Sequence, residues 1–393
     1  MPLDIDLLYR RVEQMLVSMP DTSSRQEWAK CQDFLRHADP DLLREKLRRR
    51  DRGAARIPWL VAEPLSTLAG AFSASPLPTD VSIAAADSSS IAPDRHSSLR
   101  YYVLNVGYAV LTYGSAPNAL LDARVQFCFE PQELYFDPEG KRIPIEESRL
   151  AILMAVEELT GLYGAAKLVS PPLLGLSDGS LILWNLQSED KGLQSEYLRR
   201  FLSTLDAFRR DNIPLASYVS FPGSQDVVNS LRVMLCDRSA GDCAHCPQQT
   251  EDQTLCRFMR GVWDRQLFDG MLRPGERTDI FQSQSAILDK YGEHHIQFFY
   301  LNVGGEIARI EAPQWVMADS TMLDLAHSAV IDQCRKSAQY PPYPSVLIEA
   351  HEQAVISTAD RQAVEGLVEQ ALAARGIIYV RSAKDRSKRS RGV

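Results

Sequence analysis

A succession of β-prone segments constrains the fold of this chain more than any other feature. Residues 81–86 (VSIAAA) are short, apolar and bounded by turn-forming residues, which is typical of an inner strand covered on both faces. Two longer β-prone segments follow at 101–114 and 123–130, separated by a Ser-Ala-Pro-Asn turn. Together these segments predict one inner strand followed by a β-meander.

Helices and further strands alternate after this meander. Residues 146–163 predict an apolar helix, 173–186 another strand, and 193–210 an amphipathic helix. Strand, strand, strand, helix, strand, helix is the order of an RNase H-like sheet, so we expect a mixed α/β core. Later segments predict strands at 214–221, 294–303, 306–313 and 376–380, and helices at 319–336, 345–357 and 360–375.

The predicted elements divide the chain into five parts. The parts are an N-terminal helical region (1–75), the first part of the core (76–230), a cysteine-bearing insertion (231–275), the second part of the core (276–381) and a basic tail (382–393). The tail has too few apolar residues to fold around and is predicted to be disordered.

The charge balance argues against a generally basic nucleic-acid coat. The chain has 43 Lys and Arg against 51 Asp and Glu, a formal charge of −8. This balance does not exclude a local basic channel, and the residues that could contact phosphates, or simply face solvent, are Arg48, Arg49, Arg50, Lys388 and Arg389. No apolar run reaches the roughly 18 residues of a membrane span, and the N-terminus lacks a signal pattern, so we expect a soluble, cytoplasmic protein.

Four of the 7 cysteines are clustered in the insertion, with the spacing Cys-x6-Cys-x2-Cys-x9-Cys. Four thiolates could hold tetrahedral zinc or an iron–sulfur cluster, with His245 as an alternative ligand, and four unligated thiols are the competing interpretation. The spacing resembles the iron–sulfur loop of endonuclease III-like glycosylases, with a longer last interval. The cysteines are Cys236, Cys243, Cys246 and Cys256.

Acidic residues occur inside segments that are otherwise predicted to be buried. Asp87 ends the first apolar run before Ser-Ser-Ser, and Asp178 interrupts the 173–186 segment, although each could simply start a turn. Glu157 and Glu158 follow each other on the apolar helix, so one of them is expected to face the core or a site. Three carboxylates brought together would repel one another unless Mg²⁺ or Mn²⁺ held them, and such a site catalyses phosphodiester hydrolysis.

The C-terminal part adds an imidazole. A helix beginning at Ser345 is predicted to carry His351. A lone helical histidine is more often a packed or surface residue, but near a metal it could be a ligand or a proton donor to the leaving group.

Three motifs, in this order along the chain, resemble the NurA-type nucleases, a family that works beside the hexameric HerA translocase in processing double-strand DNA ends. They are DSSS (87–90) followed by YYVLNVGYAVLTYG, then LSDGSLILWNL (176–186), then YPSVLIEAHEQAVISTADR (343–361). The resemblance covers roughly residues 80–380 apart from the cysteine insertion. It implies an RNase H-like core, bound Mn²⁺ or Mg²⁺, and a homodimer whose channel takes a DNA end.

The resemblance also implies roles for individual residues. The implied catalytic set is Asp87, Glu157, Asp178, Tyr343 and His351. All but Tyr343 would bind the metal, Tyr343 would position the phosphate, and Glu157 is chosen over Glu158. Many relatives have Asp-Gly-Ser where this chain has Asp-Ser-Ser, a change that could alter the turn behind the first ligand.

These observations predict a metal-dependent phosphodiesterase. The specific expectation is a Mn-dependent deoxyribonuclease, an exonuclease and/or single-strand endonuclease, that processes DNA ends in double-strand break repair with a HerA-like ATPase. One alternative is an RNase H-like hydrolase acting on RNA or flap substrates. The other is a catalytically inactive subunit that docks onto a HerA-like translocase.

Overall fold

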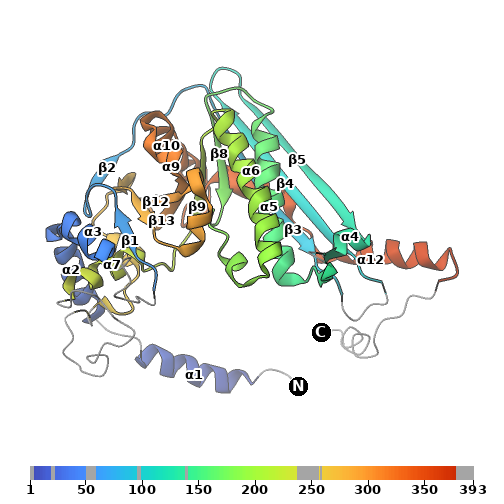
Figure 1. The fold of residues 1–393 in the computed structure, drawn as a ribbon, viewed down its shortest axis with the longest axis horizontal. Coiled ribbons are helices and arrows are strands. Elements are labelled where there is room, and N and C mark those ends of the chain that lie inside the picture. Colours follow the sequence, from blue (N-terminus) through green and yellow to red (C-terminus); the bar gives the residue numbers. More distant parts are fainter. Residues whose placement is uncertain are drawn as a thin grey trace.

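The computed structural model describes residues 4–18, 23–49, 59–94, 99–137, 140–236, 256 and 259–377. Within these ranges the chain forms one large mixed sheet with helices on both faces, and a cluster of helices at one end (Figure 1). The predicted α/β class is therefore confirmed.

Five strands form the centre of the sheet in the order β5-β4-β3-β8-β9. Their bounds are β3 (Val81–Ile91), β4 (Tyr102–Tyr113), β5 (Asn118–Cys128), β8 (Leu173–Asp178) and β9 (Leu215–Val219). β3, β4 and β5 pair as an antiparallel meander, while β3, β8 and β9 are parallel. An antiparallel meander joined through its first strand to two parallel strands is the RNase H-like order that the sequence predicted.

Further strands extend the sheet beyond β9 in the order β13-β12-β11-β1. They are β13 (Ile307–Pro313), β12 (Ile296–Asn302), β11 (Phe281–Ser283) and β1 (Ala62–Pro64), while β10 (Glu276–Thr278) pairs with β12 and with β2 (Ala71–Ser73). The short strands β1 and β2 lie in a stretch expected to be helical or a connector. Their extended conformation depends on partners more than 200 residues away, so local sequence could not reveal it. A separate pair consists of β6 (Tyr135–Phe136) and β7 (Ile143–Pro144).

Helices cover both faces of the central strands (Figure 1). α5 (Glu147–Ala166) and α6 (Lys191–Arg210) pack on one face, and α10 (Ser320–Lys336) and α11 (Ser345–Ala354) on the other. Along β3, Ala84 and Ala86 belong to the first core, whereas Ile83 and Ala85 belong to the second. A strand that is apolar on both sides is what a sheet covered on both faces requires.

A second group of helices packs against the far edge of the sheet. It contains α2 (Ser23–His37), α3 (Pro40–Arg49), α7 (Asp226–Leu235) and α8 (Asp264–Phe268). Leu35 and Leu43 from the N-terminal helices share one core with Leu231, Phe268 and Phe281. The N-terminal region and the segments on either side of the cysteine insertion therefore stabilise each other.

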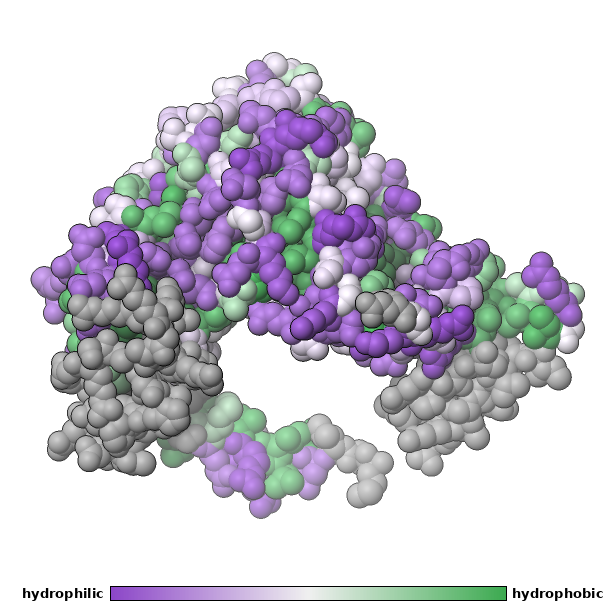
Figure 2. Space-filling view, in the orientation of Figure 1, coloured by the Kyte–Doolittle hydropathy of each residue, from purple (hydrophilic) through white to green (hydrophobic). Residues whose placement is uncertain are grey.

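The remaining helices lie at the periphery. They are α1 (Ile5–Ser18), α4 (Pro131–Leu134), α9 (Gln314–Ala318), α12 (Thr358–Ala373) and the 3-10 helices η3 (Trp184–Ser188), η6 (Ala286–Lys290) and η7 (Gly292–His294). α1 stands apart from the other helices in Figure 1, and Figure 2 shows hydrophobic and hydrophilic residues side by side on it. No helix in the described ranges has the length and apolar character needed to cross a membrane.

Two strand boundaries differ from the sequence expectation. β3 does not end at Asp87 but continues through the serines to Ile91, because its ladder with β4 continues as far as Ile91 and Val103. The 173–186 segment is a strand only as far as Asp178, and Leu181 to Leu183 are buried in a non-strand segment before η3. Of the strand predicted at 376–380, only 376 and 377 are described, and neither is in a strand.

Candidate active site

The candidate active site lies where the parallel strands β3 and β8 run side by side (Figure 1). Ala86 pairs with Ser177, so Asp87 and Asp178 are the next residues on adjacent strands. β8 ends at Asp178, and the chain turns away through Gly179, whose φ of 75° is in the left-handed region that favours glycine. The two aspartates predicted from distant motifs are therefore neighbours.

Alternation along β3 directs successive side chains to opposite helical layers. Asp87 faces α11, and its Oδ2 lies 2.6 Å from Nδ1 of His351. Ser88 faces α5 and donates a hydrogen bond of 3.1 Å to Oε2 of Glu158. Ser89 faces α11 again, and its hydroxyl donates to the carbonyl of Ala354 at the end of that helix. The serines after Asp87 thus attach both helices to the strand instead of forming a turn.

The approach of α11 depends on a glycine in β4. Gly107 is the partner of Asp87 in the β3–β4 ladder, and a Cβ on Gly107 would lie 2.4 Å from the backbone nitrogen of Ala354. Nearby, the side-chain amide of Asn105 donates to the carbonyl of Ala354 at 2.9 Å. Because the helix rests directly on the strand backbone, His351 comes within hydrogen-bonding distance of Asp87.

Glu158, and not Glu157, is the helical glutamate beside the aspartates. Burial raises the pKa of Glu158 well above its ordinary value, and the charges of Asp87 and Asp178 raise it further. Glu157 points toward α6 instead, where it forms an ion pair with Arg200. One step along an α-helix turns the side chain by roughly 100°. The structure therefore has Glu158, and not the expected Glu157, on the side of α5 near the aspartates.

Tyr343 reaches the same site from the segment before α11. Its hydroxyl donates a hydrogen bond to Asp178, and burial together with that carboxylate raises the pKa of Tyr343 far above neutrality. Its ring meets the ring of Tyr218 edge-on, with centroids 5.3 Å apart. Asp178 is exposed at the end of its strand, yet the atoms packed around its carboxylate remove enough water to raise its pKa as well. Tyr343 is thus a neutral hydrogen-bond donor at physiological pH.

The three carboxylates lack a permanent cation. In the part of the chain that the structure describes, no lysine or arginine forms an ion pair with Asp87, Glu158 or Asp178, and the imidazole of His351 contacts Asp87. The same part contains no group of three His, Cys, Asp or Glu side chains that converge closely enough to hold a metal ion. The chemistry of the donor set, three carboxylates and an imidazole, fits a hard divalent cation such as Mn²⁺ or Mg²⁺.

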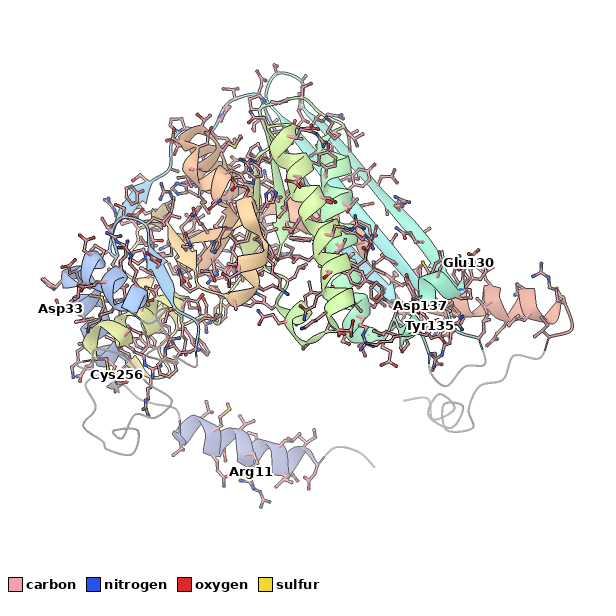
Figure 3. All side chains as sticks on the ribbon, viewed as in Figure 1. Arg11, Asp33, Glu130, Tyr135, Asp137 and Cys256 are labelled. Carbon is pink, nitrogen blue, oxygen red and sulfur yellow. The ribbon has the colours of Figure 1, made fainter. Side chains whose placement is uncertain are left out.

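The other predicted site residues lie away from this cluster or outside the described residues. Arg48 is exposed on α3. Cys236 and Cys256 are half-buried, and Cys256 is labelled at the helical end of the molecule in Figure 3, opposite Glu130 and Tyr135. The structure does not describe the side chain of Arg49. The remaining predicted residues lie outside the described ranges, and they are Arg50, Cys243, His245, Cys246, Lys388 and Arg389.

Lys46 and Arg44, which precede Arg48 in the same basic stretch of the N-terminal region, have a structural role that the sequence did not reveal. Nζ of Lys46 donates to the carbonyls of Met234 and Cys236 at 2.6 and 2.8 Å, which satisfies the C-terminal end of α7. Arg44 donates to the carbonyl of Pro64 at 2.9 Å. The charge run alone could not distinguish these contacts from phosphate binding.

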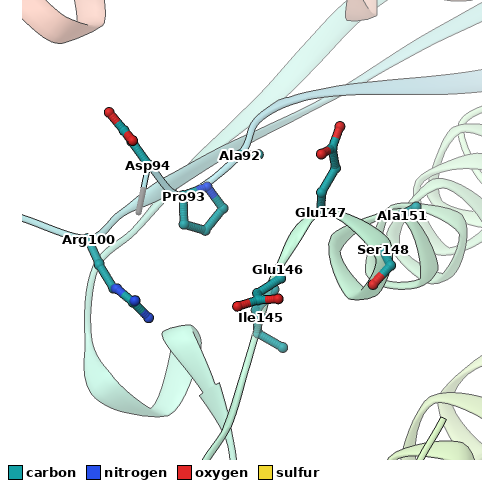
Figure 4. A pocket seen from close by; sticks show the side chains of 9 residues that line it. All are labelled: Ala92, Pro93, Asp94, Arg100, Ile145, Glu146, Glu147, Ser148 and Ala151. Atoms are coloured by element: carbon teal, nitrogen blue, oxygen red, sulfur yellow. The ribbon is translucent and has the colours of Figure 1, made fainter. Parts of the chain in front are cut away.

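A separate pocket lies between the end of β3 and the start of α5. It has a volume of about 810 Å³ and mixed charge, with Asp94, Arg100, Glu146 and Glu147 among its lining residues (Figure 4). Neither aspartate of the candidate site lines it. The pocket is therefore distinct from the carboxylate cluster.

The strand order and the acids on β3, β8 and α5 define an RNase H-like α/β protein with a carboxylate site on its central strands. The chain belongs to the NurA domain family, because the model of that family matches residues 81–356, a range that includes all five residues brought together here. The family resemblance expected from the motifs is confirmed.

Solved structures similar to this chain include the following two. One is the NurA nuclease from Sulfolobus solfataricus, with 12% identity, a TM-score of 0.49, and coverage of 93% of this chain and 98% of that chain. The other is LC9-RNase H1, a type 1 RNase H with the type 2 active-site motif, with 11% identity, a TM-score of 0.22, and coverage of 40% and 71%. No curated protein matches the sequence.

Proposed function

We propose that this protein is a divalent-metal-dependent nuclease that processes DNA ends, with Asp87, Glu158 and Asp178 as the metal ligands. The observation that carries the proposal is that Asp87 and Asp178 follow a paired position on adjacent parallel strands, with Glu158 close enough for their charges to raise its pKa. No arginine or lysine among the described residues pairs with these three acids. Like charges held together raise the free energy of the folded state unless a cation offsets them. Membership of the NurA domain family supports the same function.

Mn²⁺ or Mg²⁺ bound here would lower the pKa of an attacking water and neutralise charge on the phosphate. His351 is held by Asp87 through Nδ1 and is 61% exposed, so Nε2 is available to carry a proton to the leaving oxygen. Tyr343 fixes the carboxylate of Asp178 by the hydrogen bond that its single hydroxyl proton makes.

We further propose double-strand DNA ends as the substrate and a HerA-like hexameric ATPase as the partner, with the nuclease acting as a homodimer in double-strand break repair. These finer assignments rest on the family membership and on the motifs that carry it. A hydrolase of RNA or flap substrates, and an inactive docking subunit, remain as outcomes of the test below.

The test is cleavage of end-labelled linear and single-stranded DNA in Mn²⁺, Mg²⁺ or EDTA. We expect metal-dependent cleavage that falls roughly a thousandfold or more, about 4 kcal/mol of transition-state free energy, in Asp87→Asn, Glu158→Gln and Asp178→Asn. Glu157→Gln is the matched control, because Glu157 is on the same helix but pairs with Arg200, and it should retain most of the activity.

Other results would redirect the assignment. Cleavage of RNA in preference to DNA would favour the RNA hydrolase. The absence of cleavage in every metal, even with a HerA-type ATPase present, would favour the docking subunit. An inactive Glu157→Gln beside an active Glu158→Gln would contradict the ligand set.

A further inference from the structure

An exposed stack of two aromatic rings and a guanidinium lies beyond the carboxyl end of β9. The guanidinium carbon of Arg265 is 4.0 Å from the ring centroid of Phe221 and 3.7 Å from that of Trp263. Phe221 is 63% exposed and Trp263 is 38% exposed. Since the guanidinium covers one face of each ring, aromatic surface remains open to solvent on the side away from it.

The backbone holds Phe221 in this exposed position against its own preference. Its φ of 46° is in the left-handed region, which is uncommon for a bulky side chain. The backbone nitrogen of Phe221 donates to Oε2 of Glu306 at 3.0 Å, and Arg265 donates to the carbonyl of Pro222 at 2.7 Å. These bonds fix both the loop and the cation, so the outward ring is part of a built arrangement. Strained backbone of this kind is often found at binding sites.

The Phe221–Arg265–Trp263 stack is connected to the candidate active site by direct contacts. Asp178 pairs in register with Tyr218 across β8 and β9, and Phe221 follows only three residues later. Tyr218 contacts Tyr343 through its ring and donates from its hydroxyl to Glu306, the residue that also binds the Phe221 backbone. A strand bound at the carboxylates would reach the stack within a few nucleotides.

We propose that this stack binds an unpaired nucleobase of the DNA strand that is engaged at the carboxylates, a proposal that rests on the proposed nuclease function. An exposed ring accepts any base by its π face, and the adjacent guanidinium attracts the phosphate backbone. A base inside a duplex is already stacked on both faces and cannot use the ring. The stack therefore favours single-stranded or frayed ends over intact duplex.

The test measures binding by the full-length protein in an Asp87→Asn background, so that cleavage does not interfere. The probes are labelled oligo-dT, an abasic oligonucleotide of the same length and a blunt duplex. We expect Phe221→Ala to weaken oligo-dT binding about tenfold and to leave the abasic and duplex probes unchanged within about twofold. Phe221→Trp should retain oligo-dT binding. Phe129→Ala is the control, because Phe129 is 56% exposed and follows β5, away from this stack.

Three results would overturn the proposal. They are unchanged oligo-dT affinity in Phe221→Ala, an equal loss for all three probes, and a changed oligomeric mass with unchanged oligo-dT affinity, which would assign the surface to a protein contact. A parent protein that binds none of the probes would overturn it too. If Phe221→Ala contradicts the base-binding proposal while the wild type still cleaves DNA in a metal-dependent way, the nuclease proposal stands. The two proposals can therefore fail separately.

Discussion

Two clusters of acidic side chains in this molecule differ in whether a basic side chain pairs with the acids. One is the candidate active site, with Asp87, Glu158 and Asp178. The other, here called the Arg309 cluster, consists of Arg309 and Glu311 on β13, Asp226 on α7 and Asp264 on α8, all of them buried. In the first cluster no described arginine or lysine pairs with the acids, whereas the second contains its own cation.

The Arg309 cluster compensates its charge internally. Arg309 donates to Asp226 at 2.9 Å and to Glu311 at 2.8 Å. Burial opposes the charge of Arg309, but the two carboxylates outweigh burial and raise its pKa. Asp264 accepts from the backbone nitrogens of Val227 and Val228 at the start of α7, while burial and Asp226 raise the pKa of Asp264. Nη2 of Arg309 is buried without a hydrogen-bond partner, so the ion pairs of the other two nitrogens hold the group. A buried, ion-paired network of this kind is typical of a structural element.

The comparison indicates how one sheet can hold acids for two purposes. Acids that pair with a buried arginine organise the fold, and acids without an arginine or lysine partner among the described residues are available to an external cation. The Arg309 cluster also bonds to the segment that follows Asp178, because Glu311 accepts from Ser180 and from the backbone nitrogen of Leu181 at 2.8 and 3.0 Å. The Arg309 cluster thus positions the turn that follows Asp178 of the candidate active site.

Removal of the internal cation should have the largest effect on stability. Arg309→Met leaves Asp226 and Glu311 buried without a partner, so the free energy of unfolding should fall by roughly 3–5 kcal/mol, measured by urea denaturation. Arg199→Met is the control, since Arg199 is 68% exposed in its pair with Glu196, and should cost less than about 1 kcal/mol. Equal losses in the two variants would break the comparison.

Added Mn²⁺ should stabilise the folded protein by binding at the candidate active site and not at the Arg309 cluster. With Mn²⁺ at about 100 times its dissociation constant, the free energy of unfolding should rise by about 2.7 kcal/mol over that in EDTA, measured as a shift of the thermal midpoint. Asp178→Asn should remove most of this shift. A shift of the same size in Asp178→Asn would place the ion elsewhere.

Displacement of α11 should move His351 away from Asp87 without changing any acid of the candidate active site. A Cβ in Gly107→Ala would overlap the backbone of Ala354, so we expect a loss of roughly 1–3 kcal/mol in stability and reduced cleavage. Gly164→Ala on α5 is the matched control, because nothing lies within 4 Å of its added Cβ, and it should be neutral or stabilising by up to roughly 1 kcal/mol. Normal activity in Gly107→Ala would mean that His351 does not need this close packing.

Neutralisation of Glu158 should have the smallest effect on the free energy of unfolding, and it should raise this free energy instead of lowering it. The raised pKa of Glu158 means that the folded protein binds a proton that the unfolded chain releases above about pH 4.3. The stability of the wild type in EDTA should therefore fall as pH rises from that value to the folded pKa. Glu158→Gln removes this dependence and should be more stable than the wild type above that window.

The control for this stabilisation is Glu157→Gln. It breaks the ion pair with Arg200 and should not stabilise the protein at any pH. Denaturation curves from pH 4 to pH 9 compare the two variants. A Glu158→Gln protein that is less stable than wild type across this range would show that Glu158 is not destabilised by the charges of Asp87 and Asp178.

The sequence by itself determined the order of the central strands and helices, because hydrophobic periodicity is a local property. It also determined that Asp87 and Asp178 are acids within otherwise buried segments, and its motifs identified the family. It did not determine that β3 continues past Asp87, since Ser-Ser-Ser predicts a turn until β4 supplies backbone partners as far as Ile91.

Only the tertiary structure decided which side chains meet. Glu158 rather than Glu157 faces the aspartates because the rotation of α5 is set by its packing between β3 and α6, and two adjacent glutamates are equivalent in composition. His351 meets Asp87 because Gly107, more than 200 residues earlier, allows α11 to rest on β4. Arg309 compensates Asp226 across strands and helices far apart in the chain. Each of these contacts depends on register and packing between distant segments, which no local pattern contains.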